Sequence, residues 1–164
     1  MTAIAFDGKT LAADTMYDQG GHKGFCSKLE VLNHPIIGKM MVALSGSIRG
    51  SSLMMSQLES NTIKQVDDYD ITGVYGIAVD SGKNVYNIYG DGYCVIEHPK
   101  NQFMASGSCY EFLYGAMYAG CSAERAVGLA MEFRTDAGIE CQKLVWAEVF
   151  KDYEHERFDD DIPY

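Results

Sequence analysis

The 164-residue sequence is poor in basic residues and in proline, and it lacks any long apolar run. It holds 13 Lys and Arg against 23 Asp and Glu, a formal net charge of −10. That balance argues against a partner bound mainly through phosphates, such as nucleic acid or an anionic membrane. No apolar stretch approaches the ~20 residues that a membrane-spanning helix needs. The 3 Pro and 17 Gly indicate a chain rich in turns without low complexity.

Cysteine and histidine do not occur in patterns typical of metal or disulfide sites. The five cysteines are an odd number without a Cys-x-x-Cys pair, so we expect neither a disulfide framework nor a zinc site. The four histidines are scattered, and the sequence predicts no cofactor. The first residues, MTAIAFDGKTLAADT, lack the basic region and apolar core of a secretory signal. We therefore expect a cytoplasmic protein in a reducing compartment.

Short apolar runs between turn residues follow most of the chain and predict strands. Together with three expected helices, they indicate one α+β domain over residues 1–150, in which helices face two antiparallel sheets. The remaining residues, 151–164, form an acidic tail that we expect to fray. The expected strands lie at 3–6, 10–13, 26–32, 40–44, 73–79, 85–89, 94–97, 103–105 and 144–150.

Three stretches have apolar residues at helical spacing. The first runs from Ile48 to about Thr62, and Ser47 is available to cap it. The second follows Ser108, which with Glu111 fits a capping box, and the third follows Ser122. Small residues on the last two helices indicate close packing against a sheet or against each other.

A hairpin at the amino terminus carries the first candidate for chemistry. Asp7 and Gly8 favour a two-residue turn, whose antiparallel register would pair Thr2 with Ala13 and bring Asp14 next to the chain start. Lys28, on the next expected strand, would then lie within reach of both. The same residues also fit a plainer interpretation, with an aspartate in a turn and a lysine in solvent, and spacing alone favours that one.

Thr2 would become the first residue of the mature chain if Met1 is removed, and a small second residue permits that removal. An N-terminal threonine holds a hydroxyl nucleophile and a general base, its own α-amine, in one residue. The reference pKa of that amine, ~7.7–8.0, leaves a usable fraction neutral near pH 7. Threonine is also common as an ordinary second residue, so this signal is weak by itself.

Four motifs in order, TAIAFDGKTLAADT, SKLEVL, ALSGS and MASGS, carry a family resemblance. The chain resembles the proteasome β-subunit family and the bacterial peptidase HslV, which are N-terminal-nucleophile hydrolases. The resemblance implies an αββα sandwich, in which two antiparallel sheets lie between helical layers. One helical layer would be shortened, because the segment between the fourth and fifth strands holds one helix and an acidic link at 65–70 instead of two long helices.

The resemblance also implies an active site, and its residues transfer one by one. Two departures concern the sequence after the matched aspartates. Thr15-Met16 replaces a Ser-Arg pair, and 137–140 lacks the serine that completes the site in part of the family. The implied residues are Thr2 (nucleophile), Asp14 (carboxylate of the second strand), Lys28 (lysine that activates the nucleophile), Gly46 (backbone N–H of the oxyanion hole), Ser106 (partner of the terminal amine) and Asp136 (supporting carboxylate).

The predicted function is that of a threonine endopeptidase that hydrolyses peptide bonds within a homo-oligomer, with a ring among the expected forms. Relatives receive their polypeptide substrates from an ATP-dependent unfoldase, which is therefore an expected partner. The alternative is a catalytically silent structural or interaction protein of the same fold. Retention of Met1 and the shortened helical layer would favour that alternative.

Overall fold

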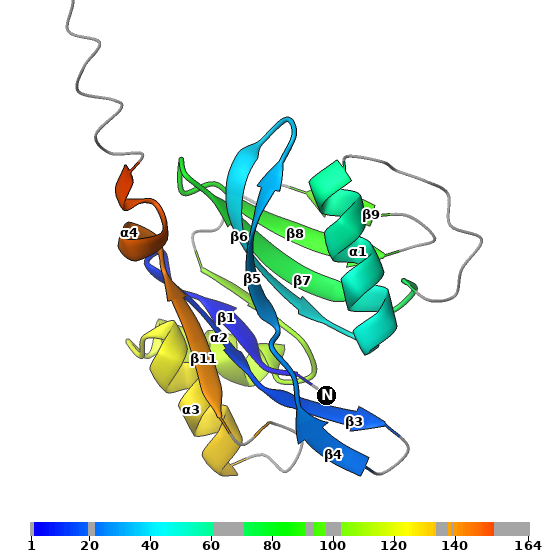
Figure 1. The fold of residues 1–164 in the computed structure, drawn as a ribbon. Coiled ribbons are helices and arrows are strands. Elements are labelled where there is room, and N and C mark those ends of the chain that lie inside the picture. Colours follow the sequence, from blue (N-terminus) through cyan, green and yellow to red (C-terminus); the bar gives the residue numbers. More distant parts are fainter. Residues whose placement is uncertain are drawn as a thin grey trace, which may run out of the picture.

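The computed structural model describes residues 2–19, 22–60, 71–90, 94–97, 103–133, 138 and 140–152. They form an α+β fold on antiparallel sheets, as predicted (Figure 1). A four-stranded sheet has the order β10 (Met104–Ser106), β1 (Ile4–Phe6), β2 (Thr10–Asp14), β11 (Cys141–Val145). A five-stranded sheet has the order β5 (Leu29–His34), β6 (Gly38–Ser45), β7 (Tyr75–Asp80), β8 (Val85–Gly90), β9 (Cys94–Glu97). The helices are α1 (Ile48–Ser60), α2 (Tyr110–Tyr118), α3 (Ala123–Phe133) and α4 (Trp146–Val149).

Three apolar clusters hold these elements together. The first lies where the sheets face each other and includes Phe6 and Leu11 from one sheet and Met41 and Ile77 from the other. The second joins the four-stranded sheet to α2 and α3, through small side chains such as Ala12. The third joins the five-stranded sheet to α1. Figure 1 shows α2 and α3 beside β1, β2 and β11, and α1 beside the larger sheet.

The register of the first hairpin differs from the predicted one by two residues. Ile4 pairs with Ala13, because the turn runs from Asp7 to Thr10 instead of through two residues alone. The Asp7 side chain widens it by accepting hydrogen bonds from the backbone N–H groups of Lys9 and Thr10, at 2.9 and 2.8 Å. A shift of two residues leaves every side chain on its expected face, so Asp14 still lies beside the amino-terminal strand.

A second hairpin, β3 (Met16–Gln19) and β4 (His22–Phe25), was not predicted. It stands apart from the two larger sheets, and the strand expected at 26–32 begins only at Leu29. The strand expected at 144–150 is also partly wrong. The chain leaves β11 at Val145, and Trp146 begins the short helix α4, its N–H donating to the carbonyl of Lys9 at 2.8 Å.

Two of the three expected helix caps are confirmed. Ser47 Oγ accepts from the N–H of Gly50 at 2.9 Å, and Ser122 Oγ accepts from the N–H of Arg125 at 3.2 Å. The capping box at Ser108 is wrong, because α2 begins one residue later, with Cys109 as N-cap and no side-chain capping bond. None of the described helices is long and apolar enough to cross a membrane. The expected acidic link at 65–70 and most of the tail, 153–164, lie outside the described residues.

Candidate active site

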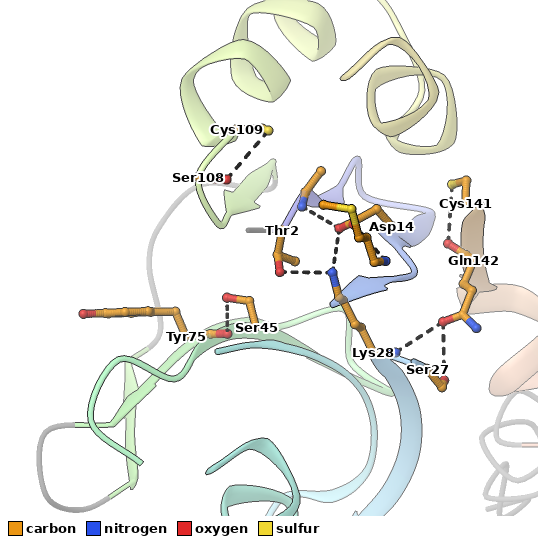
Figure 2. A network of polar contacts seen from close by, with 12 residues as sticks. Thr2, Asp14, Ser27, Lys28, Ser45, Tyr75, Ser108, Cys109, Cys141 and Gln142 are labelled. Atoms are coloured by element: carbon orange, nitrogen blue, oxygen red, sulfur yellow. Dashed lines mark hydrogen bonds and ion pairs between the residues drawn. The ribbon is translucent and has the colours of Figure 1, made fainter. Parts of the chain in front are cut away.

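Three of the expected site residues meet at the amino-terminal end of β1. The ammonium Nζ of Lys28 donates to Thr2 Oγ1 at 3.0 Å and to Asp14 Oδ1 at 2.9 Å (Figure 2). All three side chains are withdrawn from solvent, with 5% of Thr2, none of Asp14 and 8% of Lys28 exposed. A hydroxyl, an ammonium and a carboxylate therefore form one buried, hydrogen-bonded row.

The carboxylate at the end of this row is fully engaged. Asp14 Oδ1 also accepts from the N–H of Ala3 at 2.7 Å, and Oδ2 accepts from the N–H of Met16 at 3.1 Å. The backbone N–H of Asp14 donates in turn to the carbonyl of Ala3 at 3.0 Å. These bonds tie Asp14 to the residue after Thr2, so the start of the chain and the ion pair share one anchor.

Gly107 holds the other side of Thr2. It follows β10, the neighbour of β1, and its backbone is in the left-handed region with φ +92°. A Cβ at this position would overlap the carbonyl oxygen of Thr2, so only glycine allows the two backbones to lie this close. The Thr2 backbone is thus confined between Gly107 and the strand that carries Asp14.

A cavity of about 1230 Å³ opens in front of Thr2, and Gly46 and Ser106 also line it. Gly46 lies between β6 and α1 with φ +129°, where a Cβ would come within 2.9 Å of the Gly73 carbonyl oxygen. Ser106 is the residue of β10 that pairs with Ile4, and no hydrogen bond joins it to Thr2 among the described residues. Half-exposed apolar side chains, Ile48, Tyr75 and Tyr110, also line the cavity.

Of the six expected residues, four line this cavity: Thr2, Lys28, Gly46 and Ser106. A fifth, Asp14, lies outside the lining and is joined to it through its bonds to Lys28 and Ala3. The sixth, Asp136, lies outside the described residues. Sequence reasoning missed Gly107 and also Gln142, whose side chain accepts from the backbone of Lys28 at 3.3 Å. The glycine inside MASGS was a usable signal for the first, whereas no local motif marks the second.

The thiol of Cys141, near the row, is held in its neutral form. Cys141 lies opposite Asp14 in the β2–β11 pair. Burial raises the pKa of its thiol to about 11, and the nearby charge of Glu124 adds to that rise. Within the described residues, no three His, Cys, Asp or Glu side chains gather as metal ligands. With an ammonium bonded to its oxygen and a carboxylate behind that ammonium, the Thr2 hydroxyl has the surroundings that acyl transfer to a hydroxyl needs.

Comparison with known proteins finds similarity only in structure. No family model matches the chain, and no curated protein matches it. Anbu from Hyphomicrobium sp. strain MC1 superposes with a TM-score of 0.63 at 11% identity, over 100% of this chain and 99% of that one. Anbu from Yersinia bercovieri, described as an ancestral beta-subunit, gives 0.61 at 10% identity, over 100% and 98%. Anbu from Pseudomonas aeruginosa, solved as a helical assembly, gives 0.60 at 10%, over 100% and 98%.

These findings correct the family expected from the sequence motifs. The assignment to the proteasome β-subunit and HslV family is wrong, because no family model supports it and these solved structures are Anbu proteins. Anbu is itself related to the proteasome-like N-terminal-nucleophile fold, so the correction concerns the family and not the α+β fold class. At 10–11% identity the likeness shows the fold alone.

Proposed function

We propose that this protein is an N-terminal-nucleophile threonine hydrolase that cleaves peptide bonds once Met1 has been removed. The observation that carries the proposal is the position of Lys28 Nζ, 3.0 Å from Thr2 Oγ1 and 2.9 Å from Asp14 Oδ1 at the wall of a large cavity. An ammonium in that place stabilises negative charge that develops on the threonine oxygen, and the buried carboxylate fixes the ammonium.

In the proposed reaction, Thr2 Oγ1 attacks the scissile carbonyl carbon and its proton passes to the α-amine. The carbonyl oxygen becomes an oxyanion that the backbone N–H of Gly46 would stabilise, a donor worth about 3 kcal/mol in comparable sites. The C–N bond then breaks and the leaving amine takes the proton, which leaves an ester on Thr2. Water hydrolyses this ester and restores the hydroxyl. Ser106 is proposed to bond the terminal amine, and Asp136 is proposed as a supporting carboxylate.

The finer architecture and the partners belong to the same proposal. We propose that residues 1–150 form an N-terminal-nucleophile αββα sandwich whose α1 layer is shortened, with 151–164 as an acidic tail. The helical assembly solved for the Pseudomonas Anbu complex supports self-association of this chain into an oligomer. The cavity, at about 1230 Å³, has room for more than one side chain of a substrate, which supports a polypeptide substrate. We propose that an ATP-dependent unfoldase delivers that polypeptide.

The test has two steps on protein from its natural host. An intact-mass measurement is expected to show a chain without Met1, which begins at Thr2. A β-lactone inhibitor is then expected to add one acyl group to Thr2 in the wild type. It should add none in Thr2→Ala, which keeps the backbone and removes the hydroxyl.

Two results would contradict the proposal. A mature chain that retains Met1 has no free threonine amine, and a wild type that resists the β-lactone has no activated hydroxyl. Either result would favour a catalytically silent protein with a structural or interaction role, which would instead co-purify with a larger partner.

A further inference from the structure

We propose that Gln142 is a positioning residue for Lys28, an assignment that rests on the proposed function. Lys28 belongs to a three-residue connector, 26–28, that follows β4 and precedes β5 and is part of neither strand. A lysine side chain is long and flexible, so a fixed ammonium needs a fixed backbone beneath it. What holds this connector therefore bears on the Nζ–Oγ1 distance at Thr2.

The strand ladder holds only one side of the Lys28 peptide. The N–H of Leu44, on β6, donates to the Lys28 carbonyl at 3.1 Å. The Lys28 N–H does not return a bond to Leu44 and donates to Gln142 Oε1 at 3.3 Å instead. Ser27 Oγ reaches the same oxygen at 3.4 Å (Figure 2). A single side-chain oxygen thus replaces the missing partner of the ladder.

Gln142 lies on β11, which pairs with β2, the strand that carries the ion-pair partner of Lys28. Gln142 pairs with Ala13 on β2, and the next pair along the two strands is Cys141 with Asp14. The β2–β11 pair therefore carries both groups that hold Lys28. Asp14 binds the ammonium at 2.9 Å, and Gln142 binds the backbone N–H. The backbone N–H and the side-chain ammonium of Lys28 are therefore both bound by residues of the same strand pair.

A merely structural role would have a different signature. If Gln142 only stabilised the connector, its loss would lower the free energy of unfolding without changing chemistry at Thr2. As a positioning residue, it acts on the nucleophile through Lys28, and a misplacement of about 1 Å can cost ~100-fold in rate. Its loss should therefore slow the covalent step and spare the binding of the reagent.

The experiment follows Thr2 acylation by a β-lactone in the full-length protein, at several reagent concentrations. Gln142→Met keeps the length of the side chain and removes the acceptor. We expect its maximal acylation rate to fall at least tenfold, with the half-saturating concentration within twofold of wild type. Gln142→Glu restores an acceptor oxygen and is expected to stay within threefold in rate. Lys143→Gln, the neighbouring exposed position on β11, serves as matched control and should act as wild type.

The outcomes separate this inference from the function on which it rests. A wild type without acylation would overturn the proposed function and this role with it. If the wild type and Gln142→Met are both acylated, at equal maximal rates, the role of Gln142 is overturned and the proposed function stands. Equal losses in Gln142→Met and Gln142→Glu would do the same, since the acceptor would then be irrelevant. If Gln142→Met does not fold, Gln142→Asn, whose acceptor is one methylene shorter, is expected to show the same loss of maximal rate.

Discussion

Gly107, just after β10, packs its α-carbon against the carbonyl group of Thr2, the candidate nucleophile. The contact leaves no room for a side chain at 107 and confines the Thr2 backbone. The hydroxyl of Thr2 can therefore keep its 3.0 Å bond to Lys28 only while both backbones stay in place.

Gly107→Ala is expected to abolish acylation of Thr2 or slow it at least tenfold. The new methyl group overlaps the Thr2 carbonyl, and an alanine at φ +92° is strained by roughly 1–2 kcal/mol. Thermal unfolding and the acylation rate measure the two effects separately. Gly115→Ala is the control, because Gly115 lies on α2 with nothing within 4 Å of a new Cβ. That variant should unfold at or above the wild-type temperature, and a Gly107→Ala protein with the wild-type rate would remove Gly107 from the site.

The buried ion pair gives a prediction for stability. Lys28→Met keeps an apolar stem of similar length and leaves the fully buried carboxylate of Asp14 without its cation. Breaking one partner of such a pair costs about 3–5 kcal/mol in free energy of unfolding. Urea unfolding should show this loss, and Lys143→Met, which breaks the exposed pair with Glu124, should show no measurable change. Equal effects of the two variants would mean that the row at Thr2 is not buried as described.

The position of Asp14 could be predicted from the sequence although the hairpin register could not. The Asp7-Gly8 signal indicated a turn but did not show that the Asp7 carboxylate would cap two N–H groups and lengthen it. The error was two residues, which is one full period of a strand. The face of each side chain, and with it the meeting of Asp14 with the chain start, was therefore correctly predicted.

Other parts of the site depended on contacts between distant segments. The sequence between β3 and β4 contains Gly20 and Gly21, a hairpin signal that the strand prediction at 26–32 did not use. Gln142 carries no motif, and its role follows only from the pairing of β11 with β2, which no local pattern encodes. The family assignment was wrong as well, because the likeness to solved structures lies in the fold, at 10–11% sequence identity, and not in local sequence.

The thiol of Cys141 gives a prediction for chemical reactivity. Its pKa rises from the ordinary 9.0 to about 11, mainly through burial, so the native protein holds about a hundredfold less thiolate at pH 8. The rate at which iodoacetamide alkylates Cys141, measured by peptide mapping, should be about a hundredfold lower in native than in urea-unfolded protein. The raised pKa also means that this thiol favours the folded state below pH 9, and the contribution is lost as pH rises through 11. Equal alkylation rates in the two states would contradict the burial.

The turn between β5 and β6 should respond to acid. His34 Nδ1 accepts from the N–H groups of Ile36 and Ile37, both at 3.2 Å, which requires a neutral ring. Burial lowers the pKa of His34, so the unfolded chain takes up a proton first. The contribution to stability is full above pH 6.5 and is lost as pH falls through the lowered pKa.

Urea unfolding at pH 7.5 and 5.0 tests this expectation. His34→Asn keeps a side-chain acceptor that does not titrate and can bond the same N–H groups. The wild type should lose more stability than His34→Asn between the two pH values. A wild type and variant with the same pH dependence would show that His34 does not contribute to it.

The buried position of Thr2 has a practical consequence for producing this protein. An affinity tag fused ahead of the first residue would block the amine that the proposed reaction uses, and it would have to leave a nearly solvent-free site through the cavity mouth. If the proposed function holds, recombinant material purified that way would be inert because of the tag and not because of its active-site residues. Handles for purification therefore belong at the carboxyl end, or ahead of a cleavage site that leaves no scar before the threonine.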